Sequence, residues 1–365
     1  MPDPLSLLKD PLFIDIVVIF GVYMILSLSF NIEYGFTGIP NLGKVLFYAI
    51  GAYVAGGIAA WIALRITAFT PKIPAEGPAY CAYGAPQTIT EVFKTNPEFA
   101  IGVFLLSLIV GAAAGALLGV LASYPALRLR EDFLAITLLA FSEIGRLITR
   151  TEWWPVCAHY GIRGIATPFA WLGEYSRTIY MFLVLVMAAL MYLLAEKLVN
   201  SPWGRAMKAV RDDELAAEVY GKNPARVRAQ AMAVGSAMAA VAGTLYAFYL
   251  GSIMPDDFMP IVTFLAIAMV MLGGTANNRG VVVGVAVLVL VDRLFNASVL
   301  ERKFGIPLPD YLANSIAYLK YVVIGMVIIL ILIFGPQGLI PEKPLKTPIV
   351  EETKKRLKML ARKES

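Results

Sequence analysis

The sequence alternates between apolar runs of roughly 18–25 residues and short polar loops, and this pattern limits the fold more than any other feature. A helix of that length matches the ~30 Å hydrocarbon core of a bilayer. Charged residues are only 16% of the chain, against about 25% in a typical soluble protein. A membrane β-barrel would need alternating strands of about ten residues, which the sequence lacks. We therefore expect an all-α polytopic integral membrane protein.

Nine apolar segments are expected to cross the membrane, at about 12–30, 44–64, 99–124, 133–150, 178–195, 231–250, 260–277, 281–300 and 316–335. The first has no small-residue cleavage site, so we expect it to be retained as a span. Gly35, Gly38, Pro40 and Gly43 interrupt the stretch 31–60, which predicts a broken or re-entrant segment near 34–53. The count is thus nine or ten transmembrane helices. Nine would place the N-terminus outside, and ten would place it inside.

Basic residues gather in two regions and set the expected orientation. Residues 196–230 carry seven Lys and Arg, and the chain after Gly335 carries eight. Basic loops favour the cytoplasmic side, and four expected spans separate the two regions, so both fit inside. We expect one transmembrane domain at 1–340 with a cytoplasmic loop at 196–230, followed by a basic cytoplasmic tail at 341–365. The tail suits contact with anionic membrane lipid.

The few cysteines and histidines limit the chemistry of the chain. Cys81 and Cys157 fall in loops expected outside the cytoplasm, where they are either separate thiols or a disulfide that ties two loops together. With one histidine, a metal site of ordinary ligands is not expected. The chain has no G-x-x-x-x-G-K-[ST] motif and no motif that joins a nucleophile to a base, so we expect no enzyme activity. Its net charge of +5 belongs to cytoplasmic loops and does not indicate nucleic acid.

The interrupted segment is the first candidate for function. Non-helical backbone at membrane depth is tolerated only inside the protein or along a water-filled path. Transporters use such breaks to bring freed backbone groups to polar substrates. The segment is either part of a translocation path or an ordinary loop before a span that starts at Lys44. The candidate path residues are Gly35, Thr37, Gly38, Pro40, Asn41, Gly43 and Lys44.

Two further patterns concern helix packing. Glu143 and Arg146 lie three residues apart on one helix face, and charges within a membrane span usually pair or line a cavity. We favour a structural bridge near the outer membrane surface. Gly111, Gly115 and Gly119 form a stripe that allows close helix approach, and we favour packing within this chain over dimerisation.

A short cytoplasmic helix is predicted at 212–221. Asp212 and Asp213 suit the start of a helix, and Gly221 suits the left-handed position that ends one. Asn223 and Pro224 suit the cap and first position of the next helix. From the residues alone, this helix either rests on lipid headgroups or docks on a partner protein.

The chain resembles the membrane subunit of branched-chain amino acid ABC importers, a family that also includes urea and amide permeases. Four motifs in the family's order, and a closing one, carry the resemblance: Asn31, Gly35, Gly38, Gly43 and Gly51-Ala52-Tyr53; DFLAITLLAFSEIGR at 132–146; Ser201, Gly204-Arg205-Ala206, Ala209, Arg211, Glu214, Ala216-Ala217 and Gly221; LGGTANNRGVVVG at 272–284; and FGPQGL at 334–339. The chain departs from the family pattern at Pro40-Asn41, at Lys44 in place of the usual histidine, and at Leu215 in place of a frequent glutamate. These departures leave the substrate unidentified.

The resemblance implies a permease subunit that moves branched-chain or related hydrophobic amino acids across the cell membrane. Its implied partners are a second homologous permease chain, two ABC ATPase subunits that bind ATP and Mg, and an extracytoplasmic substrate-binding protein. The chain itself would hold no cofactor. The implied ATPase-docking residues are Asp212, Asp213, Glu214, Ala216, Ala217, Glu218 and Gly221. Three alternatives remain: a urea or short-amide permease, a membrane-embedded subunit of a redox complex, and an ATP-independent carrier.

Overall fold

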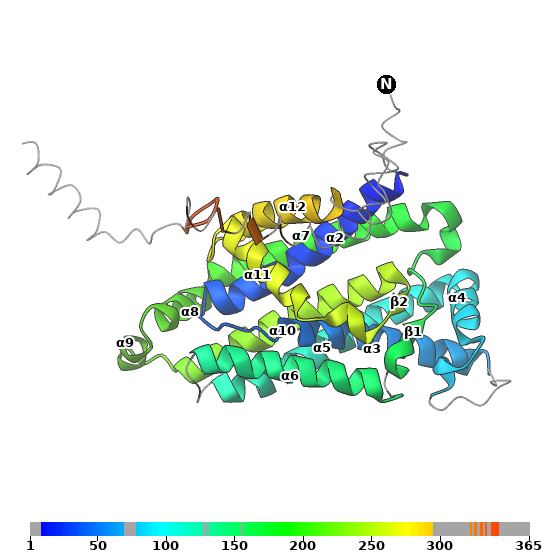
Figure 1. The fold of residues 1–365 in the computed structure, drawn as a ribbon, viewed down its shortest axis with the longest axis horizontal. Helices are drawn as coiled ribbons and strands as arrows, with labels where there is room; N and C mark the ends of the chain where they lie inside the picture. The colour runs from blue at the N-terminus through cyan, green and yellow to red at the C-terminus, as the bar shows by residue number, and fades with distance from the viewer. Residues whose placement is uncertain are drawn as a thin grey trace, which may run out of the picture.

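The chain folds into a bundle of long helices, as the computed structural model shows (Figure 1). The structure describes residues 9–68, 78–126, 131–154, 156–294 and 337–342, with Leu129 and isolated positions between 322 and 333. The α-helices are α2 (Pro11–Phe30), α3 (Lys44–Ile66), α4 (Ala85–Thr95), α5 (Pro97–Ala126), α6 (Glu131–Thr151), α7 (Ser176–Val199), α8 (Pro202–Asp212), α9 (Glu214–Val219), α10 (Pro224–Leu250), α11 (Ile261–Gly273) and α12 (Asn278–Leu294). Two short strands, β1 (Ile162–Arg163) and β2 (Ser252–Ile253), pair antiparallel.

Six helices of the described chain are long and apolar enough to cross a membrane: Pro11–Gly35, Lys44–Ile66, Pro97–Pro125, Ala170–Val199, Pro224–Leu250 and Pro255–Gly273. The protein is therefore an all-α, multi-pass membrane protein, as the sequence predicts. The expected span at 133–150 lies in α6, and the one at 281–300 begins in α12. The ninth segment, 316–335, lies outside the described residues apart from isolated positions, as does the tail beyond Glu342.

The predicted interruption lies between α2 and α3. The last turn of α2 widens into a π-helix at Asn31–Gly35, and residues 36–43 are non-helical. The break is shorter than expected, because Lys44–Ile66 is one continuous helix. It joins two long helices and adds no further helix between them.

Helix α10 forms the centre of the bundle and packs most extensively against α5 and α3. Small residues explain this position. A side chain at Gly51 would place its Cβ 1.9 Å from a carbonyl oxygen of α10, so only glycine fits there. Gly111, Gly115 and Gly119 of α5 also face α10, where Thr244, Ser236 and Met232 lie against them. The prediction that this stripe packs within the chain is confirmed.

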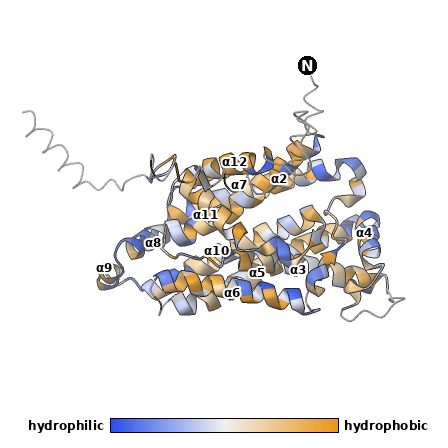
Figure 2. Ribbon diagram, viewed as in Figure 1, coloured by the Kyte–Doolittle hydropathy of each residue, from blue (hydrophilic) through white to orange (hydrophobic). Residues whose placement is uncertain are grey.

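The bundle has two different ends. Helices α8 and α9 lie together at one end, and α4, β1 and β2 lie at the other (Figure 1). Hydrophilic residues gather on α8 and α4, while the long helices between the ends are mainly apolar (Figure 2). The segment 337–342 returns to the α8 end, because Glu342 pairs with Lys208 at 3.0 Å. The loop at 196–230 and the start of the expected tail therefore share one end.

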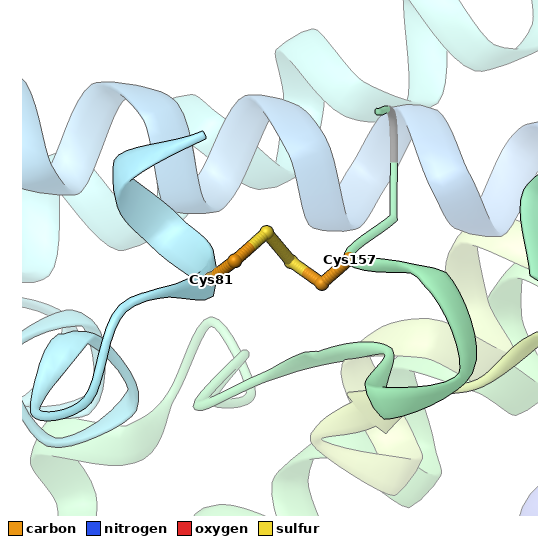
Figure 3. Close-up of a disulfide and its surroundings, with 2 residues drawn as sticks. All are labelled: Cys81 and Cys157. Carbon is orange, nitrogen blue, oxygen red and sulfur yellow. A yellow bond between two sulfur atoms is a disulfide. The ribbon is translucent and has the colours of Figure 1, made fainter. Parts of the chain in front are cut away.

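Cross-links hold the opposite end together. Cys81 and Cys157 form a disulfide between two loops that are 76 residues apart in sequence (Figure 3). In the two-stranded sheet, Ile162 pairs with Ile253 and Arg163 pairs with Ser252. Thr90 of α4 donates a hydrogen bond of 3.1 Å to the carbonyl oxygen of Gly164. Three separate loops are thus joined into one cap.

Candidate functional site

The short helix α9 projects from the end of the bundle beyond α8 (Figure 1). Asp213 ends α8 and caps α9, because its carboxylate accepts a hydrogen bond of 2.9 Å from the backbone N–H of Ala216. Gly221 then adopts a φ of +75°, which ends the helix in a left-handed conformation. Asn223 caps α10 by accepting from the N–H of Arg226 at 3.0 Å. These caps place the helix at Glu214–Val219, inside the predicted range of 212–221.

The exposed side of α9 includes some, but not all, of the predicted docking residues. Ala217, one of the predicted docking residues, is buried and adds almost no surface to the exposed side of the helix. Glu214 pairs with Arg228 of α10 at 2.9 Å and turns this side of α9 inward. The exposed side carries Leu215, Val219 and Tyr220, whose exposed fractions are 76%, 86% and 85%. We call these three residues the apolar triad of α9. Of the other predicted docking residues, Asp212, Asp213, Ala216, Glu218 and Gly221 are exposed.

A buried ion pair closes the break between α2 and α3. Lys44 Nζ donates to Glu33 Oε1 at 2.7 Å, and both side chains are fully buried. Asn41 Nδ2 donates to Glu33 Oε2 at 2.9 Å. The carboxylate lies against Gly235 of α10, where any added Cβ would overlap it. The pair therefore fixes the end of α2, the break and the start of α3 against the central helix.

The candidate path residues are packed inside the protein in this conformation. Gly35, Thr37, Asn41, Gly43 and Lys44 are buried, and Gly38 and Pro40 are half-buried. The Thr37 hydroxyl donates to the carbonyl oxygen of Ile32 at 2.9 Å. Thr263 of α11 accepts a hydrogen bond of 3.0 Å from the N–H of Val45, which has no cap within its own segment. The break is thus held by contacts from other helices, and its role in a path stays a prediction.

One face of α8 connects the break to the segment 337–342. Arg211 donates to the carbonyl oxygen of Gly35 at 2.7 Å and to Glu342 at 3.1 Å. Lys208, one turn earlier, pairs with Glu342 at 3.0 Å and lies over the ring of Phe36. Partial burial opposes the charge of Arg211, but Asp212 and Glu342 raise its pKa overall, so the side chain stays cationic.

Three of the sequence motifs meet near this face. Asn31 at the end of α2 donates to Asn278 of α12 at 3.0 Å and accepts from the N–H of Ala276 at 2.9 Å. The backbone N–H groups of Leu339 and Ile340 donate to the carbonyl oxygens of Leu272 and Gly273, both at 2.9 Å. The motifs are therefore spaced along the sequence but form one packed cluster at the α8 end of the bundle.

The pair at Glu143 and Arg146 lies toward the other end. Arg146 donates to Glu143 and also to Asp256 at 2.9 Å, which ties α6 to the turn before α11. The bridge thus joins α6 to the turn before α11 and includes Asp256 in addition to the predicted pair. Beside it, a groove of about 910 Å³ runs between α3, α5 and α6. Its walls are mainly apolar, with Tyr53 and Thr149 among its few polar side chains.

Several side chains that join distant parts of the bundle were not among the predicted site residues. Glu33 is a charge within an apolar span, and this alone marks it as unusual. Glu342 and Asp256 gave no signal, because their partners lie more than a hundred residues away. Across the described residues no group of three or more His, Cys, Asp or Glu side chains could hold a metal ion.

Comparison with known proteins identifies relatives along most of the chain. The sequence model of the family described as "Branched-chain amino acid transport system / permease component" matches residues 12–332. A relative from Methanocaldococcus jannaschii, named "Probable branched-chain amino acid transport permease protein LivM", is 36% identical over 333 residues, 90% of this chain and 93% of the relative. The "High-affinity branched-chain amino acid transport system permease protein LivM" of Escherichia coli is 29% identical over 352 residues, 90% of this chain and 70% of that protein. The protein of the same name from Salmonella typhimurium is 30% identical with the same coverage. No solved structure matches the chain.

Proposed function

Since this chain belongs to the branched-chain amino acid transport permease family, we propose that it is a permease subunit of an ABC importer for branched-chain or related hydrophobic amino acids. ATP hydrolysis in separate subunits drives the transport, and the chain itself is not an enzyme. ATP and Mg²⁺ bind to those subunits, and this chain holds no cofactor. The names of the relatives support the substrate class, and a urea or short-amide permease is the alternative within the same family.

The apolar triad of α9 is the observation that carries this proposal. Leu215, Val219 and Tyr220 are exposed at the end of the bundle, beyond the apolar part of the long helices. Lipid headgroups are one possible cover for such a surface. However, Asp212, Asp213 and Glu218 are exposed and lie close to the triad along the chain, and acidic side chains are repelled by the anionic lipid that attracts basic segments. A protein partner with an apolar cleft fits this surface better, and we assign it to the ATPase subunit.

The orientation follows from the distribution of basic residues. The loop 196–230 and the segment 337–342 share one end, and the two basic regions of the sequence begin there. We place this end in the cytoplasm of a cell whose plasma or inner membrane holds the complex. The domain at 1–340 then carries the cytoplasmic docking loop, and residues 341–365 form a cytoplasmic tail. The cap with α4, β1 and β2 lies at the opposite end of the bundle (Figure 1). In this orientation it faces outward, where it would meet the extracytoplasmic binding protein.

The remaining partners follow from the importer architecture. A second homologous permease chain completes the transmembrane unit, and two ATPase subunits bind its two docking helices. The substrate moves along a path built in part from the break at 36–43, which opens when the docking helices move. The buried state of Lys44 and Asn41 then corresponds to a closed form of this path.

The disulfide agrees with the outward placement of the cap. A bond between Cys81 and Cys157 persists outside the cytoplasm and would be reduced inside it. Mass measurement of the intact protein under non-reducing conditions should show no free thiol, and reduction should reveal two. Two free thiols before reduction would contradict this placement.

Co-purification with the ATPase tests the proposed docking surface. Replacing Leu215, Val219 and Tyr220 together by serine should reduce recovery of the ATPase on the tagged permease at least tenfold. Tyr83 is equally exposed, at 85%, and lies two residues before α4, which is at the other end of the bundle (Figure 1). Tyr83→Ser is therefore a matched control that should leave recovery unchanged. Undiminished recovery with the triple variant would contradict the assignment of the triad.

A further inference from the structure

Helix α8 touches the break through two side chains on one face. Arg211 donates to the carbonyl oxygen of Gly35, the last residue of the π-helical turn. Gly38 lies so close to Arg211 that an added Cβ would be 3.3 Å from its Cγ atom. Lys208 lies 5.3 Å from the ring centre of Phe36. The break is thus in direct contact with the helix that leads into α9.

Arg211 and Lys208 also contact Glu342 of the segment 337–342. Glu342 accepts from Arg211 at 3.1 Å and pairs with Lys208 at 3.0 Å. The backbone just before Glu342 is bonded to the end of α11, through Ile340 and Gly273. This face of α8 is therefore held between the break on one side and the 337–342 segment on the other.

We propose that Arg211 is the positioning residue that transmits movement of the docking helix to the break between α2 and α3. The proposal rests on the proposed function, because it requires α9 to be moved by an ATPase. Asp213 joins α8 to α9 without a linker, so displacement of α9 displaces Arg211. The bond to Gly35 then pulls on the turn that carries Glu33, and through Glu33 on Lys44 at the start of α3.

The choice of arginine follows from the number of acceptors around it. The guanidinium reaches the Gly35 carbonyl, the Asp212 carboxylate and the Glu342 carboxylate at 2.7, 2.9 and 3.1 Å. A planar fork with five N–H donors can serve three acceptors in fixed directions, whereas a lysine ammonium is a flexible point charge. The side chain can therefore keep its anchor on Glu342 while it holds Gly35.

The test measures uptake and ATP hydrolysis in the same vesicles, with the complete complex reconstituted. The variants are Arg211→Gln, Arg211→Lys and the charge swap Arg211→Glu with Glu342→Arg. The swap restores an ion pair between positions 211 and 342, but a glutamate cannot donate a hydrogen bond to Gly35. Arg205→Gln on the exposed face of α8 is the matched control.

Uptake per ATP hydrolysed should fall about tenfold or more with Arg211→Gln and with the swap. The reason is that the free energy of a hydrogen bond from a charged donor corresponds to roughly a factor of ten or more in an equilibrium constant. Uptake per ATP hydrolysed should fall less with Arg211→Lys and stay unchanged with Arg205→Gln, while co-purification of the ATPase is unaffected. A purely structural role would lower assembly, hydrolysis and uptake in parallel and leave the ratio unchanged, which would overturn the proposal.

Two other results would also overturn it. The first is a swap variant with the wild-type ratio, since the ion pair and not the bond to Gly35 would then matter. The second concerns the case in which Arg211→Gln fails to assemble: a wild-type ratio of uptake to ATP hydrolysis in Arg211→Lys would then overturn the proposal. Absence of ATP-driven uptake by the wild-type complex would instead refute the proposed function, so the two failures are distinguishable.

Discussion

Removing the charge of Lys44 should destabilise the protein more than any other single change at the break. Its ammonium lies 2.7 Å from Glu33 Oε1, and neither side chain has any exposed surface. Lys44→Met would leave the Glu33 carboxylate buried without its cation, although Asn41 would still donate a hydrogen bond to it. Loss of one member of a buried ion pair typically costs about 3–5 kcal/mol, because the other charge stays uncompensated.

A double variant separates the cost of an unpaired charge from the value of the pair. In Glu33→Gln with Lys44→Met, no charge remains, and the glutamine oxygen can still accept from Asn41. Exchange of a buried ion pair for neutral groups is often close to neutral, so we expect a free energy of unfolding within about 1 kcal/mol of the wild type. Asn41 and Gly235 are unchanged in both variants, which keeps the surroundings matched.

Equilibrium unfolding in mixed micelles, followed by the fluorescence of the five tryptophans, gives the free energies. We expect a large loss of the free energy of unfolding for Lys44→Met and near recovery of it in the double variant. A single variant as stable as the wild type would show that Glu33 is not buried as a charge. A double variant as unstable as the single one would show that packing, and not the uncompensated charge, sets the cost.

Three further predictions concern other parts of the bundle. Gly51→Leu should prevent close packing of α3 on α10 and sharply lower the yield of folded protein. Gly57 has open space around it, so Gly57→Leu should express like the wild type. Equal yields of the two variants would contradict this prediction. Ala217→Trp should displace α9 from α10 and lower uptake in reconstituted vesicles severalfold while ATP hydrolysis continues; unchanged uptake would argue against a coupling role for α9. Replacing Cys81 and Cys157 by serine should lower the free energy of unfolding by about 2–4 kcal/mol, measured against the oxidised wild type, and reductant should have no effect on the variant.

The sequence predicts the elements whose causes are local. The expected spans that lie in the described residues are all helical, because apolar runs of this length have few other solutions in a bilayer. The bounds of α9 were predicted to within two residues because Asp213 and Gly221 act on their own neighbours in the chain. The intrachain contact of the α5 glycine stripe was also predicted, from its spacing alone.

The pairing of Glu33 with Lys44 could not be predicted in this way. On a continuous helix, eleven residues correspond to about 16 Å along the axis, far beyond the reach of an ion pair. The π-helical turn and the break at 36–43 bring the two side chains to 2.7 Å. The depth of the break follows in turn from contacts such as Thr263 with Val45, which join helices more than two hundred residues apart.

The exposed side of α9 is a second feature that could not be predicted from the sequence. The predicted docking residues include the buried Ala217, because the helix is too short for its apolar positions to show which side faces the bundle. The ion pair between Glu214 and Arg228 settles the direction, and it depends on how α10 begins. Exposure of Leu215, at the position where the family often has glutamate, was therefore visible only in the structure.

Uptake by the reconstituted complete complex tests the central claim most directly. Vesicles that contain this chain, its second permease, the ATPase and the binding protein would be supplied separately with leucine, isoleucine, valine, phenylalanine and urea. We expect the branched-chain amino acids to accumulate only when ATP is supplied inside the vesicles, and we expect this accumulation to be lost with the serine variant of the apolar triad. Uptake that proceeds without ATP, or urea as the one accumulated solute, would contradict it.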